Sequence, residues 1–535
     1  MTRKVPIRDF GSELPILSPL DEGELAELPC GCCSPPGTPP RPGWLEKYDF
    51  SLDGFSALGL PLPRSKEEEE TIVACFLRGL EKLFTPENNW AFLLPTVLST
   101  DYCLRCNTCN ASCMIYESSG RQDVYRANFR SELLRRIYKR YFTAAGRLMG
   151  RWAGADLELD WRVVYRLAEL AYRCTLCRRC AAACPIGVDN ALLARELRKL
   201  FSLEMGLAPE AVHRSGTVPH LAGGAATGMT PAGFLDTLAF IEELIEEKTG
   251  RRIKIPVDKQ GAEILLVHNS GEYLSWPENP AAFAILFEAA GVDWTLSSAS
   301  CGYEAVNYGV WYDDVQLARI VAAQLGEARK LGVKKIVVGE CGHATKATVT
   351  IAERLLAGGS TIRRESCLPL LAKIAAEGRV RFDPARNDFP VTLHDPCNLV
   401  RLMGIVEPQR AVLQRVLPPG RFREMPRAGT KNYCCGGGSG FAVMDNLNFP
   451  EWRNCVASRT KARQVLDAFA DCLDPSIPKY YCAPCSNCKA AARDGLLEHY
   501  GFKQRYNITY GGLAELMVNA LPDLPRPYLS WESEF

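Results

Sequence analysis

Short apolar runs alternate with helical stretches from about residue 259 to the C-terminus. AEILLVH, VDWTLS and KKIVVGE are short and rich in β-branched residues, whereas segments such as PAAFAILFEAAG have helical spacing. Strands that alternate with helices predict parallel α/β structure. The alternation then repeats, with PVTLH, KNYCC and PKYYCA as three further predicted strands. Strand starts near 263, 293 and 334 correspond to starts near 390, 431 and 478, which predicts an internal duplication.

The pattern is different before residue 259. Helical stretches such as RVVYRLAELAYR dominate the middle of the chain, and the N-terminal part contains LPCGCCSPPGTPPRPGW, whose prolines exclude helix and central strand. Cys30, Cys32 and Cys33 lie in that stretch without nearby ligands to complete a metal site, and their role stays open. We predict five parts: an extended N-terminal arm and helix (1–90), a helical cysteine-rich domain (91–210), a helical connector (211–258) and two α/β halves (259–385 and 386–535).

Composition excludes several classes of function. A formal net charge of +1 gives no electrostatic case for nucleic-acid binding. The N-terminus lacks the apolar stretch of an export signal, and no apolar run approaches the length of a transmembrane helix. We therefore expect a cytoplasmic protein without a membrane span of its own, in which 23 cysteines need a chemical explanation.

Eight of these cysteines form two runs with the spacing of bacterial ferredoxins, C-x2-C-x2-C-x3-C. In that pattern three thiolates surround one [4Fe–4S] cubane and the fourth binds the other. The spacing predicts two clusters with crossed ligands: Cys103, Cys106, Cys109 and Cys184 for one, and Cys174, Cys177, Cys180 and Cys113 for the other. Zinc would need two pairs of ligands rather than two runs of four, and disulfides are unexpected without an export signal. The 60-residue spacer between the runs suggests the helical two-cluster domain of respiratory iron–sulfur subunits.

A second group of cysteines follows the predicted strands of the last α/β half. Because strand carboxyl ends meet at one edge of a parallel sheet, these thiolates are expected to converge there. Gly436-Gly437-Gly438 gives the chain the freedom to turn two adjacent cysteines toward one point. The expected site consists of Cys397, Cys434, Cys435, Cys485 and Cys488, with His394 beside it. A buried thiol cluster or a zinc site is the alternative, and no flavin or nicotinamide motif is present.

These motifs resemble those of the heterodisulfide reductases. The segments HDPCNLVR, NYCCGGGSG, GECGHA and SCGYEAVNYG, behind a ferredoxin-like domain, resemble DsrK and the related HdrD-like subunits over about residues 40–520. The resemblance implies a helical two-cluster ferredoxin domain followed by a duplicated α/β domain whose CCG motif binds one noncubane [4Fe–4S] cluster. It also implies that Cys485 and Cys488, before Lys489, complete that site, and that Cys482 is a core thiol.

The resemblance further implies a function. Electrons from a quinone-reactive or cytochrome b membrane subunit, with a cytochrome c subunit as a further partner, would pass through the cubanes to the noncubane cluster. There a disulfide or trisulfide, carried by a small DsrC-like protein, would be reduced at the inner face of the membrane. His394 and Lys489 are candidates for proton delivery or thiolate pairing.

The first α/β half departs from the motif. Of the five cysteines it retains only Cys301 and Cys341, in Ser300-Cys301-Gly302 and Cys341-Gly342-His343-Ala344, so we expect no second noncubane cluster. Two other functions stay open. The chain could be the iron–sulfur subunit of a flavin-dependent lactate, glycolate or glycerol-phosphate dehydrogenase, or an electron wire without a substrate of its own.

Overall fold

The computed structural model describes residues 58, 60–119, 121–355, 362–445 and 449–531. The predicted N-terminal arm up to residue 57, with its three cysteines, lies outside these residues. The chain divides into two compact units. The helical unit takes in the chain up to Val212 with Trp311–Asp313 and Gly436–Ala462, and the α/β unit takes in His213–Val310, Asp314–Cys435 and Arg463–Phe535.

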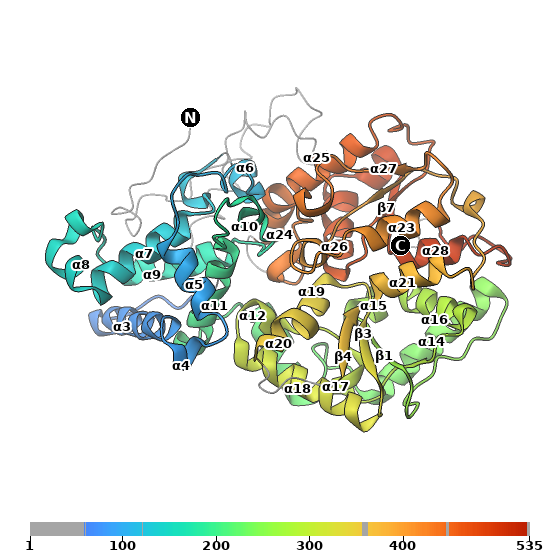
Figure 1. Ribbon diagram of the computed structural model, residues 1–535, viewed down its shortest axis with the longest axis horizontal. Coiled ribbons are helices and arrows are strands. Elements are labelled where there is room, and N and C mark those ends of the chain that lie inside the picture. Colours follow the sequence, from blue (N-terminus) through green and yellow to red (C-terminus); the bar gives the residue numbers. More distant parts are fainter. Residues whose placement is uncertain (1–57, 59, 120, 356–361, 446–448, 532–535) are drawn as a thin grey trace. The chain divides into compact units, whose positions relative to one another are not determined.

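The helical unit is built around a buried central helix, α11 (Asn190–Met205), which contacts α3 and α9 (Figure 1). Asp189 caps its N-terminus by accepting from the amides of Ala191 and Leu192, and Gly206 ends it in the left-handed conformation. Charged side chains on this buried helix are paired, because Glu196 bridges Arg195 and Lys199. The other α-helices of this unit are α3 (Lys66–Leu83), α4 (Pro86–Asn89), α5 (Leu93–Asp101), α6 (Met114–Ser118), α7 (Phe129–Phe142), α8 (Ala144–Met149), α9 (Trp161–Tyr172), α10 (Arg179–Ala183), α12 (Glu210–Val212) and α24 (Phe449–Trp452).

The α/β unit contains two parallel four-stranded sheets with the same topology. The first has the order β2-β1-β3-β4, and the second has the order β6-β5-β7-β8. The strands are β1 (Ile264–Val267), β2 (Trp294–Thr295), β3 (Lys335–Val338), β4 (Arg363–Ser366), β5 (Val391–Leu393), β6 (Phe422–Arg423), β7 (Lys479–Cys482) and β8 (Ile508–Gly511). The duplicated parallel α/β architecture predicted from the sequence is confirmed.

Helices cover both sheets and continue the apolar core. The buried residues of α16 and α28 belong to the same hydrophobic core as strands β1, β3, β5 and β7. Burial of these apolar faces stabilises the fold of this unit. Each Å² of apolar surface removed from water contributes roughly 25 cal/mol of free energy. The principal helices are α14 (Pro231–Thr249), α15 (Ser270–Ser275), α16 (Glu278–Ala290), α18 (Asp314–Lys330), α21 (Cys367–Ala376), α23 (Glu407–Val416), α25 (Arg459–Ala468), α26 (Ser486–Ala491) and α28 (Leu513–Asn519).

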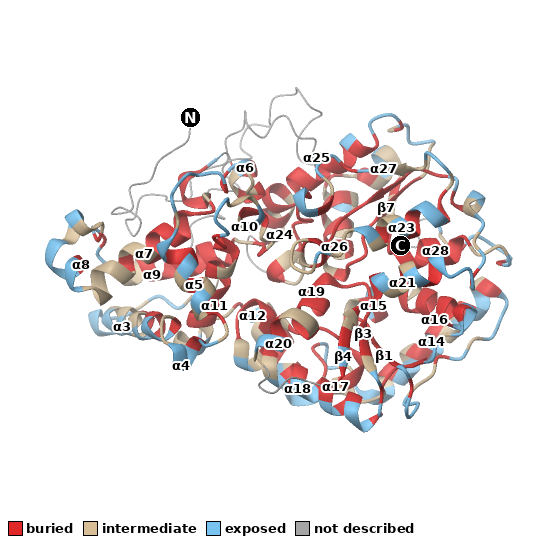
Figure 2. Ribbon diagram, in the orientation of Figure 1, coloured by how far each residue is buried: buried red, intermediate tan, exposed pale blue. Residues whose placement is uncertain are grey.

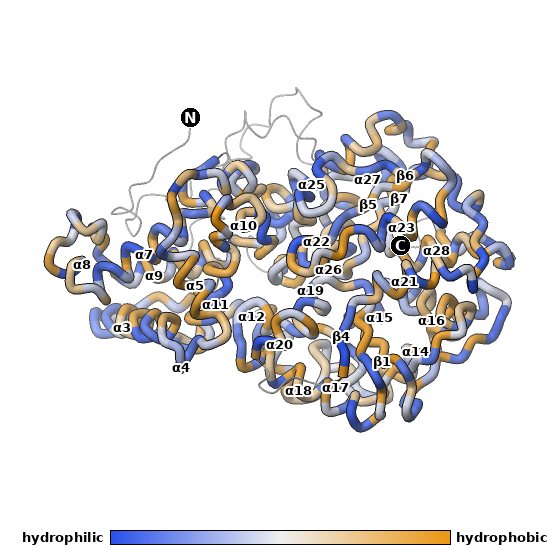
Figure 3. The backbone as a smooth tube through the Cα atoms, in the orientation of Figure 1, coloured by the Kyte–Doolittle hydropathy of each residue, from blue (hydrophilic) through white to orange (hydrophobic). Residues whose placement is uncertain are grey.

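One predicted strand is wrong and two strands escaped prediction. KNYCC is irregular backbone, and the strand at that place in the sheet is β6, several residues earlier. The edge strand β4 has the sequence RRES and is hydrophilic along the tube in Figure 3, so it lacks the apolar signal of β1. Strand β8 also lies at an edge and reads as ITYG. Within the described residues, none of the helices has both the length and the apolarity that a bilayer crossing requires.

Candidate iron–sulfur sites

The two cysteine loops of the helical unit follow the same backbone path. In each loop the residues two and four positions after the first cysteine have a positive φ of 52–64°. Such alternation turns successive N–H groups toward one point and forms a nest that suits an anionic ligand, as in many iron–sulfur sites. A non-glycine residue adopts this conformation at a cost of about 1–3 kcal/mol. Because the same costly conformation occurs at the same two positions in both loops, we infer that both loops bind the same kind of ligand. The four residues are Arg105, Asn107, Leu176 and Arg178.

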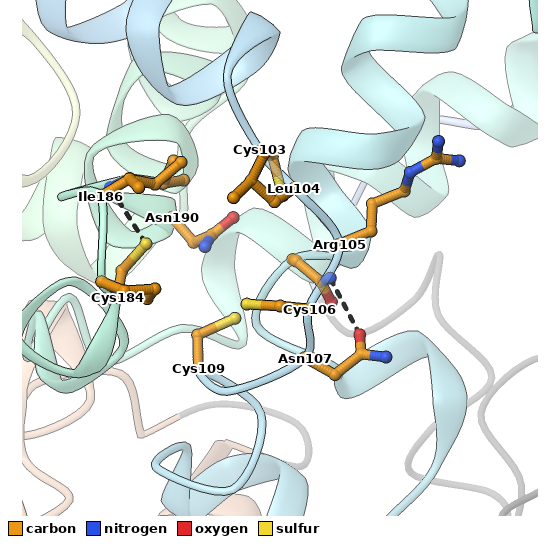
Figure 4. A pocket seen from close by; sticks show the side chains of 12 residues that line it. Cys103, Leu104, Arg105, Cys106, Asn107, Cys109, Cys184, Ile186 and Asn190 are labelled. Atoms are coloured by element: carbon orange, nitrogen blue, oxygen red, sulfur yellow. Dashed lines mark hydrogen bonds between the residues drawn. The ribbon is translucent and has the colours of Figure 1, made fainter.

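The first site brings cysteines from both runs together. One pocket is lined by Cys103, Cys106, Cys109 and, from the other run, Cys184. In Figure 4 the sulfur atoms of Cys106 and Cys109 point toward one another, and Cys184 lies nearby. Burial and the neighbouring thiolates raise the pKa of Cys109 to about 12. A positive metal centre would offset this repulsion, so the group fits a thiolate-bound cluster.

The second site is assembled in the complementary way. Burial is the main cause that raises the pKa of Cys113 to about 11, and Cys174 and Cys177 of the other run contribute. Burial also raises the pKa of Cys180 well above its usual value. The thiols of Cys174, Cys177 and Cys113 contribute to this rise. Cys113 therefore lies near Cys174, Cys177 and Cys180 of the other run, and Cys184 lines one pocket with Cys103, Cys106 and Cys109.

A buried arginine and the glycine-rich segment lie beside Cys174 of the second site. The guanidinium of Arg198 donates to the carbonyl of Cys174 at 2.7 Å and to the carbonyl of Ser439 at 3.0 Å. The Ser439 hydroxyl also donates to the Cys174 carbonyl at 3.0 Å. Gly436–Ala462, which begins directly after Cys435, thus belongs to the helical unit and packs against the second site.

In the α/β unit a side-chain network fixes the irregular NYCC segment against the HDPC loop. Asp395 forms a two-point ion pair with Arg410, at 2.9 and 2.8 Å, and accepts from the backbone amide of Gly429 at 2.6 Å. The Asn432 side chain donates to the Asp395 carbonyl at 2.7 Å. Within the segment, the Asn432 carbonyl accepts from the Arg401 guanidinium at 2.8 Å, a side-chain partner in place of a neighbouring strand.

The predicted cysteines of the last half are buried near the carboxyl ends of the strands. Cys397 begins α22 (Cys397–Val400) after β5, and Cys485 and Cys488 lie at the start of α26 after β7. The ligand atoms of His394, Cys435 and Cys488 lie within 4.8 Å of one another. The exposed fractions are 9% for Cys397, 0% for Cys434, 4% for Cys435, 3% for Cys485 and 3% for Cys488.

Thiol–thiol hydrogen bonds connect the group. The Cys434 side chain is the largest of the influences that raise the pKa of Cys435. Burial raises the pKa of Cys488, which is hydrogen-bonded to both Cys435 and Cys485. Hydrogen bonds from Cys341 and Cys488 lower the pKa of Cys485 well below its usual range. Buried thiolates packed this closely repel one another, and a positive metal centre is the group that relieves such repulsion.

Cys341 lies outside the ligand set predicted from the sequence, but the structure places it against that set. Its thiol is hydrogen-bonded to Cys485, and the adjacent Gly342 amide donates to the Cys485 sulfur at 3.4 Å. The two cysteines occupy equivalent places, since each caps the helix after the third strand of its half. Cys301, by contrast, lies in α17 (Ser300–Tyr303) near Glu327. The duplication was the signal that could have paired Cys341 with Cys485.

The two proton-delivery candidates lie in different surroundings. His394 is part of the thiol group described above. The ammonium group of Lys489 pairs with Glu272, lies 3.8 Å from Glu515, and sits 5.2 Å from the centre of the Trp276 ring. Cys482 is the last residue of β7 and lies in the hydrophobic core, where the sequence interpretation placed it.

Comparison with known proteins agrees with this arrangement. Residues 99–188 match the 4Fe-4S dicluster domain family, and residues 391–491 match the family described as cysteine-rich domain, CCG. The chain is 29% identical to Hdr-like menaquinol oxidoreductase iron-sulfur subunit 2 of Archaeoglobus fulgidus, over 90% of this chain and 93% of the relative. It is 30% identical to the iron-sulfur subunit of the Hdr-like menaquinol oxidoreductase of Archaeoglobus profundus, over 70% and 71%. A component of the dihydromethanophenazine:CoB–CoM heterodisulfide reductase of Methanosarcina acetivorans is 24% identical, over 71% and 87%.

A dicluster domain joined to a duplicated CCG-type α/β unit defines an iron–sulfur oxidoreductase subunit of the heterodisulfide reductase type. Within that class, the chain belongs to the family of Hdr-like menaquinol oxidoreductase iron–sulfur subunits.

Proposed function

We propose that this chain is the electron-transfer and catalytic subunit of a membrane-associated quinol oxidoreductase that reduces a disulfide or trisulfide. The observation that carries the proposal is the convergence of buried, mutually hydrogen-bonded thiols with His394 at one edge of the second sheet. Ligands bind at the carboxyl edge of parallel sheets. The names of the Archaeoglobus relatives support menaquinol as the source of electrons.

The cubane ligands would be the two crossed sets: Cys103, Cys106, Cys109 and Cys184, and Cys174, Cys177, Cys180 and Cys113. Cys397, Cys434, Cys435, Cys485 and Cys488 would hold the noncubane [4Fe–4S] cluster. When bound, the cubanes would supply one-electron steps and the noncubane cluster would supply the centre for two-electron sulfur chemistry.

Exposure supports an order for the two cubane sites. Cys106 in the first site is exposed, and neighbouring Leu104 is 69% exposed, so a donor can approach there. Cys180 in the second site is buried, and the second site contacts the segment that directly follows Cys435. Electrons would therefore enter at the exposed first site, and the buried second site would follow it in the order of transfer.

The residues around the thiol group would prepare it for sulfur chemistry. The Cys341 thiol and the Gly342 amide both donate toward the Cys485 sulfur and favour its ionised form. His394 lies close enough to Cys435 and Cys488 to give or take a proton during cleavage of a disulfide. Lys489 would instead position α26, because its charge is balanced by Glu272 and Glu515.

The remaining parts of the proposal concern partners and place. A membrane-integral quinone-reactive or cytochrome b subunit, with a cytochrome c subunit in addition, would hold the chain at the cytoplasmic face of the membrane. A small DsrC-like sulfur-carrier protein is the proposed disulfide substrate, by resemblance to the DsrK-type subunits.

The direct test is disulfide reduction by the isolated full chain after reduction with dithionite. We expect it to reduce a DsrC-type protein disulfide, as followed by alkylation of the released thiols and mass spectrometry. Failure with this substrate but turnover of the CoB–CoM heterodisulfide would overturn the protein-substrate assignment. Failure with every disulfide would leave an electron wire as the function.

Cys341 gives a separate prediction. Cys341→Ala should lower the midpoint potential of the noncubane cluster by tens of millivolts, in order of magnitude, because hydrogen bonds to cluster sulfurs raise the potential. Cys341→Ser keeps a donor at that position and is the matched control. Redox titration followed by electron paramagnetic resonance measures both. An unchanged potential in the alanine variant would remove Cys341 from the site.

A further inference from the structure

The tip of the helical unit between α7 and α9 exposes large apolar side chains. It consists of α8 and the short 3₁₀ helix η4 (Gly150–Ala153), and Figure 2 shows α8 as exposed. Leu148 is 87% exposed, Met149 54% and Trp152 91%. Isolated apolar side chains are common on protein surfaces, but three large neighbours that protrude this far indicate a surface that meets something apolar.

The tip is a fixed corner rather than a loose loop. The Thr143 hydroxyl donates to the Lys139 carbonyl at 2.8 Å and accepts from the Gly146 amide at 3.1 Å. A side chain at Gly146 would collide with the Lys139 carbonyl oxygen, so α8 is packed directly onto the end of α7. The Ala155 amide then closes the corner on the Gly150 carbonyl at 2.9 Å.

The same segment is strongly basic. Residues 133–155 contain six arginines and lysines and no acidic residue. Arg136 is paired with Glu132 and Asp156, whereas Arg147 and Arg151 are exposed, directly before Leu148 and directly before Trp152 in the chain. The six are Arg135, Arg136, Lys139, Arg140, Arg147 and Arg151. Exposed tryptophan and leucine flanked by basic residues match the interfacial region of an anionic membrane.

We propose that this tip binds lipid directly, with Leu148, Met149 and Trp152 in the interfacial layer and the arginines on anionic headgroups. A stable protein interface buries about 800 Å² per partner from about 20–30 residues, more than a corner of about ten residues offers. Tryptophan is the residue favoured at the membrane–water boundary. This contact is additional to the partner subunits of the proposed function, and its test does not depend on disulfide reduction.

Lipid binding at this tip would have a consequence for electron entry. The tip and the exposed first cubane site belong to the same helical unit, so a tip held at the membrane would keep the site close to a quinol-oxidising partner. The local concentration of the site near the membrane would rise without a new protein contact.

The test is co-sedimentation of the full chain with vesicles. We expect binding to vesicles of equal parts phosphatidylcholine and phosphatidylglycerol, and little binding to pure phosphatidylcholine. Leu148→Ser/Met149→Ser/Trp152→Ser should weaken binding at least about tenfold, and Arg147→Gln/Arg151→Gln should remove most of its salt dependence. The matched control is Leu235→Ser/Phe240→Ser, on the exposed face of α14, which should bind as the natural chain does.

Two results would overturn the proposal. The first is equal vesicle binding by the tip variant and the control. The second is no vesicle binding by the natural chain combined with loss of the membrane subunits from the tip variant during purification, because the tip would then be a protein interface. Circular dichroism checks that each variant is folded, which is expected because the substituted side chains are exposed.

Discussion

Cys435→Ala should abolish disulfide reduction and leave both cubane sites intact. Cys435 is the thiol that contacts Cys434, Cys488 and, within 4.8 Å, the His394 ring, so its loss opens the centre of the group. Loss of a residue that only supports a metal ligand already lowers metal affinity or activity about 10–100-fold. Loss of a proposed ligand should therefore lower the rate of disulfide reduction more than about 100-fold. The assay is disulfide reduction by the dithionite-reduced full chain, with iron analysis to count the clusters that remain.

Cys482→Ala is the matched control for this variant. Cys482 is a fully buried cysteine near the same carboxyl edge of the second sheet, but it belongs to the hydrophobic core. Its substitution should lower stability modestly and leave the iron content and the rate unchanged. Normal turnover by Cys435→Ala, or loss of the cluster in Cys482→Ala alone, would contradict the assigned ligand set.

Lys489→Ala should destabilise the α/β unit severely. The ammonium group is completely buried and forms an ion pair with Glu272, which is also completely buried. Burial raises the pKa of Glu272 to about 7 and the pKa of Glu340 to about 8, and Lys489 is the main influence that opposes both shifts. Removing one member of a buried pair costs about 3–5 kcal/mol, because the other charge stays unpaired. For a unit of this size that corresponds to a fall in the melting temperature of roughly 5–15 °C.

The control for Lys489 is a lysine in an exposed pair. Lys254 pairs with Glu242 on the surface with 86% of its side chain exposed, and Lys254→Ala should change stability by no more than about 1 kcal/mol. Lys489→Met combined with Glu272→Gln should recover much of the loss, since no unpaired charge remains between these two positions. Equal melting temperatures for Lys489→Ala and Lys254→Ala would show that the buried pair does not hold the two halves together.

Most of the candidate site could be predicted from the spacing of the cysteines. Two complete C-x2-C-x2-C-x3-C runs and the strand–cysteine repeats are local patterns, and the fold follows from the alternation of apolar runs with helices. The strand prediction for KNYCC was wrong because Tyr433, Cys434 and Cys435 have β-type composition, whereas side chains hold this segment in place. The Asn432 side chain donates to the Asp395 carbonyl, and the Asn432 carbonyl accepts from Arg401. Strand β4 escaped because its place at the edge allows a charged sequence.

Long-range contacts account for what the sequence could not predict. The duplication relates Cys341 to Cys485 as equivalent positions, but their contact across 144 positions depends on how the two halves pack. The balance of Lys489 by Glu272 and Glu515 likewise joins residues from both halves. The exposure of Leu148 and Trp152 could not be predicted from the sequence either, because the same residue types are common in the core of a helical domain.

The most direct test of the central claim is a paramagnetic signal that depends on substrate. The full chain, loaded with its clusters and oxidised in the presence of a thiol substrate, should give an electron paramagnetic resonance signal that is absent without the thiol. The signal should vanish in Cys435→Ala while the reduced cubane signals persist. A signal of the same size in Cys435→Ala, or no dependence on the thiol in the natural chain, would contradict the assignment of sulfur chemistry to this group of thiols.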